Sequence, residues 1–245
     1  MALDAGTIIG EGLGALAVAG LAAGGCVYAS LWPGSQIFGR TLIAPRRPDE
    51  IALTFDDGPN PAWTPRLLEL LAKHDVKATF FLIGKYAAEE TVLTRYIANG
   101  GHAIGNHSWS HPDLSRTWPG KVREELRRTK DTLEGITGKS VRLFRPPYGA
   151  RRPDVLKAAR AMGMEPVLWN AMTNDWDQPP AQAIVERLVV KVERTAERGQ
   201  AANIVLHDGG SRMLGADRGP SVKAAEMLIE RFQGSRRFVT VEEWG

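Results

Sequence analysis

The chain is short of cysteine and of excess charge, and each shortage excludes a class of protein. With one cysteine among 245 residues it forms no internal disulfide and no zinc site built from cysteines. Its 31 basic and 28 acidic residues leave a net charge of +3, too small to predict a nucleic-acid partner. The composition is that of a folded protein and excludes a disordered chain, a collagen-like repeat and a coiled coil.

The N-terminal part of the chain lacks basic side chains. Arg40 is the first of them, and only Asp4 and Glu11 carry charge before it. The stretch Gly12–Trp32 holds 21 uncharged residues and would span about 30 Å as a helix. Three interpretations stay open, namely a membrane-spanning anchor, a secretory signal peptide and a buried or extended soluble segment. The net acidic start of the chain disfavours the signal peptide.

We therefore predict three parts along the chain. Residues 1–33 are expected to form a hydrophobic membrane anchor, residues 34–47 a linker rich in proline, and residues 48–245 the folded domain. Arg46 and Arg47 follow the apolar stretch, so the positive-inside rule places the folded domain in the cytoplasm. The chemistry described below favours the other side of the membrane, and we expect an anchored domain outside the cytoplasm.

After residue 48, short apolar runs alternate with amphipathic segments. Strands are predicted over 51–55, 78–82, 103–105, 143–145, 165–169, 203–206 and 237–241. Helices are predicted over 63–74, 89–98, 118–133, 153–162, 181–194 and 220–232. Such alternation predicts a parallel α/β fold that is closed, or nearly closed, into a barrel.

Polar and aromatic side chains follow almost every predicted strand. In parallel α/β barrels the carboxyl ends of the strands carry the active site. The segments found there are Asp56–Pro59, Asn106–Pro112, Arg145–Gly149, Thr173–Trp176 and His207–Gly210. We expect these five segments to meet at one end of the barrel.

Two aspartates and two histidines have the spacing of a metal site with a neighbouring base. Asp56 and Asp57 are adjacent, so one side chain can bind a metal while the other stays free, although Asp-Asp-Gly-Pro also suits a plain turn. His107 and His111 are four residues apart, which places both imidazoles on one face of a helical turn. Such pairs are also common in cores and on surfaces. Adding Asp57 gives a ligand set that leaves positions open for water and substrate.

Other side chains in these segments have a functional and a structural interpretation. His207 ends an apolar strand, and it is either a catalytic group or a core histidine. Arg145 next to a carboxylate base would hold that base ionised, but it could equally form a surface ion pair. Trp109, Trp169 and Trp176 are either core residues or the walls of a groove that stacks on sugar rings.

Taken in order, these motifs resemble the polysaccharide deacetylase family, also called carbohydrate esterase family 4 or the NodB homology domain. The resemblance spans about residues 48–243 and rests on five segments, namely Thr54–Pro59, His107–Pro112, Arg145–Gly149, Asp175–Trp176 and Leu206–Asp208. It implies an α/β fold, a distorted (β/α)7 barrel, here preceded by an N-terminal apolar helix. It also implies a metal-dependent hydrolase.

The resemblance implies a metal centre and a base. Asp57, His107 and His111 would bind a divalent metal, usually zinc, with cobalt or manganese as alternatives. Asp56 would be the general base, and Arg145 would orient and acidify it.

The resemblance also implies an acid, an oxyanion donor and a substrate pocket. His207 would be the general acid, and the backbone amide of Tyr148 would stabilise the oxyanion. Pro147, Tyr148, Trp176 and Leu206 would bind the substrate, with Trp176 and Leu206 shaping the pocket for the acetyl methyl group.

One position departs from the family pattern. The family usually carries an aspartate three residues before its Asp-Trp pair, where it raises the pKa of the acid histidine, and this chain has Met172 there. We therefore expect less protonation of His207 near neutral pH, and a reduced rate or an acid-shifted optimum, unless Asp175 substitutes.

The function that the resemblance implies is removal of N-acetyl groups from an N-acetylglucosamine polymer, either peptidoglycan or a chitin-like oligosaccharide, with release of acetate. Alternatives within the family are an O-acetyl xylan esterase and a deformylase of a lipid-linked sugar. Outside it are a non-catalytic carbohydrate-binding protein and a cytoplasmic amidase that does not act on sugars. The expected partners are the acetylated polysaccharide and, through the N-terminal segment, a membrane.

Overall fold

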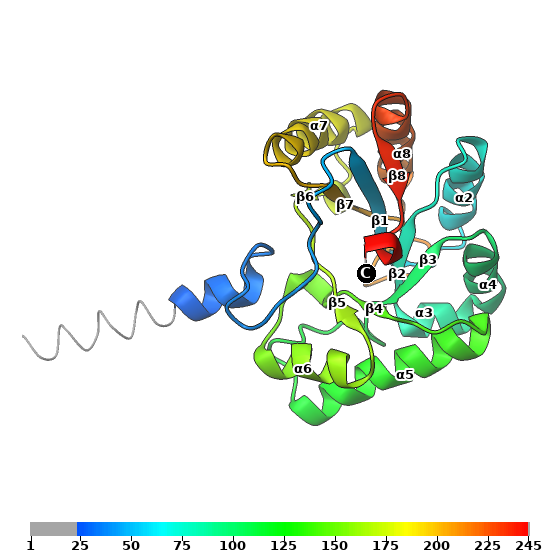
Figure 1. Ribbon diagram of the computed structural model, residues 1–245. Helices are drawn as coiled ribbons and strands as arrows, with labels where there is room; N and C mark the ends of the chain where they lie inside the picture. The colour runs from blue at the N-terminus through cyan, green and yellow to red at the C-terminus, as the bar shows by residue number, and fades with distance from the viewer. Residues whose placement is uncertain (1–23, 245) are drawn as a thin grey trace, which may run out of the picture.

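A computed structural model describes residues 24–244, which fold around one parallel sheet with helices on its outer side (Figure 1). The strands are β1 (Glu50–Gly58), β2 (Thr79–Leu82), β3 (Ala103–Asn106), β4 (Leu143–Phe144), β5 (Glu165–Pro166), β6 (Ala171–Met172), β7 (Ala202–His207) and β8 (Arg237–Val239). The helices are α2 (Thr64–Lys73), α3 (Gly84–Glu89), α4 (Thr91–Asn99), α5 (Pro119–Thr137), α6 (Pro153–Ala161), α7 (Ala181–Glu197) and α8 (Gly219–Phe232). Short 3₁₀ turns are η1 (Pro147–Gly149), η2 (Asp175–Asp177) and η3 (Val241–Trp244).

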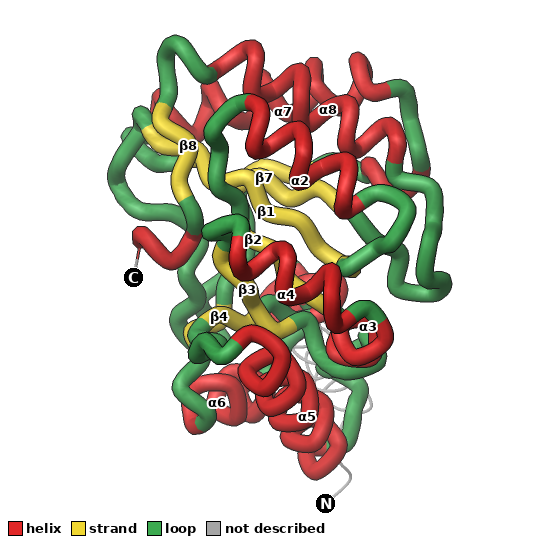
Figure 2. Tube along the Cα trace, turned by 90° about the vertical axis from the view of Figure 1, so that its right-hand side faces the viewer, coloured by secondary structure: helices red, strands yellow, loops and turns green. Residues whose placement is uncertain are grey.

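The strands follow the order β5-β4-β3-β2-β1-β7-β6, and β8 pairs with β1. Every pair is parallel, so the carboxyl ends of all strands lie on one side. Helices α7, α8 and α2 cover the sheet above, and α5 and α6 cover it below (Figure 2). This confirms the predicted α/β barrel. Within the described residues the sheet has one strand more than predicted, because the two residues of β6 carry no recognisable sequence pattern.

Alternation along β1 separates the core from the interior of the barrel. Leu53 and Phe55 belong to the main hydrophobic core, with side chains of the surrounding helices. The residues between and beyond them, Thr54 and Asp56, point inward, where both contact Arg145. A single strand therefore supplies both packing to the helices and polar groups to the interior.

The segment predicted as a linker, residues 34–47, is built into the sheet instead. Leu42 forms a parallel bridge with Val167, next to β5. On the other side, the Asn203 side-chain amide donates to the Ile43 carbonyl (2.9 Å), and the Ala201 N–H donates to the Pro45 carbonyl (2.9 Å). This blue segment runs past β6 and β5 in Figure 1, and its contacts link the residue after β5 to β7. The prolines that predict a linker also suit an extended chain with few backbone partners.

Most of the predicted membrane anchor, residues 1–33, lies outside the described residues. Its last part is a helix over residues 24–31. Among the described residues, no helix is both long enough and apolar enough to cross a membrane.

Candidate active site

The carboxyl ends of the strands surround a cavity of about 720 Å³. Asp56 on β1 and His207 on β7 are direct partners in the register of the sheet, which places both at this end. The lining includes most of the expected groups, among them Asp56, Asp57, His107, His111, Tyr148, Trp169, Met172, Trp176, Val205 and His207. The five segments predicted from the strand ends therefore do meet in one place.

Asp57, His107 and His111 are buried and form one cluster of potential ligands. The Oδ1 atom of Asp57 lies 3.5 Å from Nε2 of His107 and 3.2 Å from Nε2 of His111. The Nδ1 atom of His107 donates to the Arg145 carbonyl (2.8 Å), so its Nε2 lone pair faces Asp57. The Nε2 atom of His107 and the Oδ1 atom of Asp57 are therefore positioned to bind the same ion.

The protonation states of the cluster fit a divalent metal. Burial lowers the pKa of both His107 and His111 to about 4, so that both rings are neutral ligands at neutral pH. Burial raises the pKa of Asp57, against the opposing effect of His111 and His207. No described group hydrogen-bonds to Asp57 Oδ1, although this oxygen is buried. A buried oxygen without a hydrogen bond, facing two neutral imidazoles, is what a bound cation would satisfy.

The two histidines meet through an irregular loop and not through the predicted helical turn. Ser108 and His111 have left-handed backbone angles, with φ of 63° and 59°, and Asp57 does too, with φ of 69°. Hydrogen bonds hold this loop, since the Asn106 side chain accepts from Ser108 N–H (2.8 Å) and the Ser108 hydroxyl accepts from His111 N–H (3.1 Å). Left-handed residues that are not glycine cost about 1–3 kcal/mol each and cluster at functional sites.

Arg145 is fully buried and contacts the second aspartate, Asp56. Its Nη1 donates to Asp56 Oδ1 and to the Thr54 hydroxyl, both at 2.7 Å, and its Nη2 donates to the Asn203 side chain (3.3 Å). The guanidinium also lies over the Phe81 ring, 4.0 Å from its centre. Burial alone would raise the pKa of Asp56, but the charge and hydrogen bond of Arg145, together with contributions from His107 and His207, hold that pKa below its usual range. Asp56 is therefore an ionised carboxylate beside the ligand cluster.

His207 is held by Asp175, which corrects the expectation built on Met172. The Nδ1 atom of His207 lies 2.8 Å from Asp175 Oδ1, and its backbone N–H donates to Oδ2 of the same carboxylate (2.8 Å). The Ser221 hydroxyl also donates to that Oδ2 (2.7 Å). Burial would lower the pKa of His207, but Asp175 reverses this and raises it to about 9. Met172 only lines the cavity, so its presence gives no reason to expect an acid-shifted optimum.

Comparison with known proteins agrees with this geometry. The sequence profile of the family described as polysaccharide deacetylase matches residues 44–167. The chain belongs to the polysaccharide deacetylase family. A chitooligosaccharide deacetylase of Azorhizobium caulinodans is 36% identical over 71% of this chain and 80% of its own length. A peptidoglycan-N-acetylglucosamine deacetylase of Bacillus cereus is 36% identical over 83% of this chain and 91% of its own length.

The fold agrees with that of solved family members. A peptidoglycan N-acetylglucosamine deacetylase, solved in complex with 4-naphthalen-1-yl-N-oxidanyl-benzamide, superposes with a TM-score of 0.74. It shares 32% sequence identity with this chain, and the match covers 83% of this chain and 91% of that one. The fold of this chain is therefore similar to that of a solved deacetylase.

In this deacetylase-family protein, the turn after β4 contributes the Tyr148 side chain to the cavity. Tyr148 lines the cavity, has a left-handed backbone (φ 60°) and packs edge-on against His111, with ring centres 4.7 Å apart. Pro147 is buried at the start of η1 and is not among the lining residues. Trp176 lines the opposite wall and packs edge-on against His207, with ring centres 5.3 Å apart. Trp169 also lines the cavity, whereas Trp109 stacks under Arg128.

The expected pocket residue Leu206 is replaced by its neighbour Val205. Leu206 is fully buried in the main core, together with Ile204. Val205 and His207, on the other face of β7, line the cavity. Because side chains alternate along a strand, a residue next to His207 cannot share its face, whereas one two positions away does. This period of two is the signal that identifies Val205.

Proposed function

We propose that this protein is a metal-dependent deacetylase that removes N-acetyl groups from an N-acetylglucosamine-containing polysaccharide and releases acetate. The observation that carries the proposal is the divergence of two pKa values in one cavity. The pKa of Asp56 is lowered, that of His207 is raised to about 9, and two neutral imidazoles and the Asp57 carboxylate form a ligand cluster beside Asp56. Such divergence assigns a base and an acid. The polymer is inferred from the chitooligosaccharide and peptidoglycan deacetylases that the chain is similar to.

Asp57, His107 and His111 are proposed to hold the metal, and we favour zinc. Two imidazoles and one carboxylate suit catalytic zinc, and cobalt or manganese would also accept this set. A bound divalent ion would polarise the acetyl carbonyl and lower the pKa of a coordinated water.

Asp56 is proposed to act as the general base. Its carboxylate is ionised because Arg145 donates to Oδ1 and compensates for its burial. The other oxygen, Oδ2, lies 3.9 Å from His107 Nε2, next to the ligand cluster. It is therefore placed to accept a proton from the water that attacks the acetyl carbon. A base of this kind typically contributes about 10²–10⁴-fold to the rate.

His207 is proposed to act as the general acid. Asp175 keeps the ring protonated near neutral pH and fixes Nδ1, which leaves Nε2–H to protonate the departing sugar amine. The backbone N–H of Tyr148 is proposed to stabilise the oxyanion, a contribution typically worth about 3 kcal/mol. Trp176 and Val205 line the cavity and would contact the acetyl methyl group, and the Tyr148 ring would contact the sugar.

Two further assignments rest on the sequence. The uncharged stretch Gly12–Trp32 supports a membrane anchor, and the polymer substrate supports a catalytic domain outside the cytoplasm. A reporter fused after residue 45 of the full N-terminal segment tests both: activity on the outer side only supports them, and activity on the cytoplasmic side only contradicts the location.

Acetate release by the full-length protein tests the proposed activity. A chitin oligomer and peptidoglycan are supplied in turn to chelator-treated protein, with and without added zinc. We expect zinc-dependent release that Asp56→Asn abolishes and that Asp131→Asn, an exposed carboxylate on α5, leaves unchanged. Acetylated xylan in the same assay tests the O-acetyl alternative, because the same groups would cleave an ester. Folded, zinc-loaded protein that releases no acetate from any of the three would contradict the proposal and favour a binding protein or a lipid-linked substrate.

A further inference from the structure

A second fully buried arginine, Arg151, is solvated by backbone carbonyls. Its Nη1 donates to Ser30 O and Gly149 O, both at 3.0 Å. Its Nη2 donates to Trp32 O (2.7 Å) and Ser35 O (2.9 Å). Within residues 24–244, no carboxylate lies within ion-pair distance of it. A cation buried in this way is stabilised by the geometry of its hydrogen bonds, since no opposite charge compensates it.

Three of these four carbonyls come from the N-terminal segment. Residues 24–31 are helical, so Ser30 and Trp32 lie at the carboxyl end of that helix, where backbone carbonyls lack helical partners and the helix dipole is negative. The backbone strengthens the contact: Arg151 N–H donates to Ser30 O (3.2 Å), and the Ser30 hydroxyl donates to Arg151 O (2.9 Å). Arg151 therefore caps this helix and holds it against the domain.

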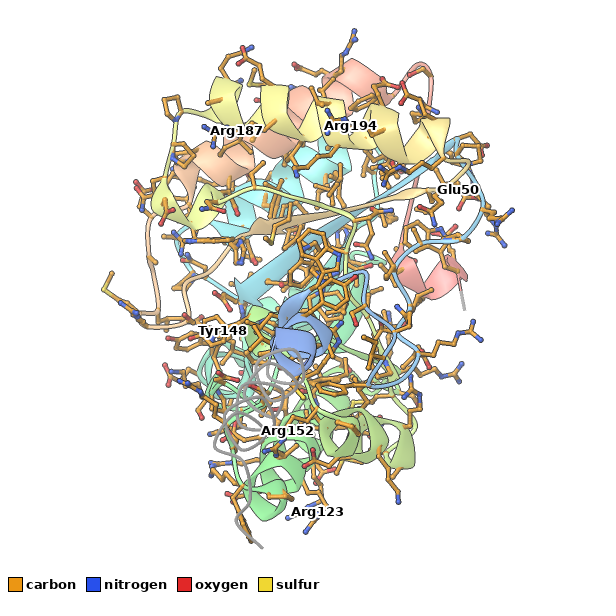
Figure 3. The ribbon with its side chains drawn as sticks, turned by 90° about the vertical axis from the view of Figure 1, so that its left-hand side faces the viewer. Glu50, Arg123, Tyr148, Arg152, Arg187 and Arg194 are labelled. Carbon is orange, nitrogen blue, oxygen red and sulfur yellow. The ribbon has the colours of Figure 1, made fainter. Side chains whose placement is uncertain are left out.

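The fourth carbonyl belongs to the turn that reaches the cavity. Gly149 follows Tyr148, and both have left-handed backbone angles, with φ of 66° and 60°. The turn is packed tightly, because a Cβ at Gly149 would lie 2.8 Å from the Trp169 ring. In Figure 3 the N-terminal helix lies beside the labelled Tyr148 and Arg152, on the side where this turn emerges. One guanidinium thus connects the end of the helix to a turn of the active site.

We propose that Arg151 is a positioning residue, which together with residues 30–35 forms a latch that holds the Tyr148 turn in its reactive conformation. The N-terminal segment would then support the active-site turn in addition to its proposed role as a membrane anchor. The proposal rests on the proposed function for its catalytic consequence. Its N-terminal half, residues 30–35, precedes the region of the chain that matches the family profile, which begins at residue 44.

Loss of the guanidinium would affect catalysis more than metal binding. It would leave the carbonyls of Gly149, Trp32 and Ser35 without this donor, while Ser30 O would keep the Arg151 N–H, and the strained backbone at Tyr148 would relax. Asp57, His107 and His111 come from other strands, although the Tyr148 ring packs on His111, so we expect zinc affinity to change much less than kcat. Displacement of groups that contact the transition state by about 1 Å can cost up to about 10²-fold in rate. A transition-state contact that is lost lowers kcat and kcat/KM equally.

The test uses the full chain with Arg151→Met and Arg151→Lys, and Arg152→Met as the matched control. Arg152 is the next residue and is bound instead by Thr117 and Asp154. For Arg151→Met we expect kcat to fall at least about 10-fold with KM and zinc affinity within about twofold of wild type. Lysine keeps the charge but cannot present a planar fork to four carbonyls, so Arg151→Lys should fall between. The control should keep wild-type kcat.

Hydrogen exchange separates a latch from general destabilisation. In both Arg151 variants, exchange should accelerate together in residues 24–37 and 145–151 and stay unchanged in β1. Ser30→Ala, which removes only the hydroxyl contact to Arg151, should give the same pattern more weakly and guards against a variant that fails to fold. Coupled exchange supports the latch even in protein that shows no turnover, so its failure is distinct from failure of the proposed function. Exchange that rises in one segment only, or wild-type kcat in Arg151→Met, would overturn it.

Discussion

Two arginines six residues apart are both fully buried, yet the chain compensates for their charge in different ways. Arg145 donates to the Asp56 carboxylate inside the barrel, where it forms an ion pair with further hydrogen bonds to Thr54 and Asn203. Arg151 donates only to backbone carbonyls, on the side of the barrel that faces the N-terminal helix. The Asp56 carboxylate neutralises the charge of Arg145. The carbonyls around Arg151 instead point the negative ends of their dipoles at its guanidinium.

The two arginines therefore have different effects on the groups that they contact. A partner with a titratable charge has its pKa changed, so Arg145 determines the protonation state of Asp56. Carbonyls do not titrate near neutral pH, so Arg151 determines only where the backbone lies. Variants at the two positions should therefore differ in their dependence on pH as well as in the size of their effect.

The largest effect is expected for Arg145→Met. Without the guanidinium, the largest influence that opposes burial is lost and the pKa of Asp56 rises, so the base becomes protonated at a higher pH. We expect kcat/KM at pH 7 to fall about 10²–10⁴-fold and the acidic limb of the pH–rate profile to move to higher pH. A lowered carboxylate pKa contributes stability above its unfolded value that is lost as pH falls, and in the variant this contribution should be absent. An unmoved acidic limb would show that Arg145 does not control Asp56.

Asp175→Asn applies the same reasoning to a buried histidine and should have the next largest effect. The pKa of His207 is raised from 6.5 to about 9, so its protonated form stabilises the fold fully below about pH 6.5, and this stabilisation is lost as pH rises through about 9. Without Asp175, the largest influence that raises this pKa is lost, so the pKa of His207 should fall. We expect the alkaline limb of the pH–rate profile to move down and the rate at pH 8 to fall about 10²-fold. Asp131→Asn, an exposed carboxylate on α5, is the control, and an Asp175→Asn variant with an unchanged alkaline limb would argue against His207 as the acid.

Arg151→Met should have a smaller effect that does not depend on pH. Leaving buried carbonyls without a donor costs about 1–3 kcal/mol, which denaturant unfolding measures directly. Because its partners do not titrate, the pH–rate profile should keep the limbs of the wild type at a lower rate. A shift of either limb would mean that Arg151 acts on a titratable group, and the contrast with Arg145 would fail.

Leu206→Ala and Val205→Ala compare a residue of the core with a residue of the cavity. We expect these two variants to have the smallest effects on the reaction. Leu206 packs in the core, so its truncation should lower the free energy of unfolding by about 2–5 kcal/mol with little change in KM. Val205 lines the cavity, so its truncation should change KM by a few-fold with a smaller loss of stability. Steady-state kinetics and unfolding of the two variants decide the question, and equal effects on KM would contradict the assignment of the two faces of β7.

Much of the site was predictable because each group follows a strand whose apolar sequence is easily recognised. Asp57, His107 and His111 come together as expected, and Arg145 meets Asp56 as expected. The helical turn for the two histidines was wrong, because their loop uses left-handed residues that no sequence spacing indicates. Leu206 was expected in the pocket but packs in the core, because side chains alternate along β7 and Val205 shares the face of His207.

Two other features, the Asp175 contact of His207 and the pairing of residues 34–47, depend on residues far away in the sequence. Asp175 reaches His207 across 32 positions and substitutes for the aspartate that the family carries at Met172, a match that depends on where η2 lies. The predicted linker joins the sheet because its partners, Val167 and Asn203, lie more than a hundred residues further along. An extended chain with prolines looks the same in sequence whether it is solvated or paired.

The sequence by itself determined the fold class and the inventory of reactive groups, because apolar periodicity and strand-end motifs are local properties of the chain. Only the tertiary structure decided which group faces which. The ion pair of Arg145 with Asp56 joins residues 89 positions apart, and the contact of Arg151 with Ser30 joins residues 121 apart. A strand-end motif points to Arg145 in the sequence, whereas no motif points to Arg151. Their roles differ because the effect of a buried charge depends on the polar groups next to it. Tertiary packing determines which groups those are.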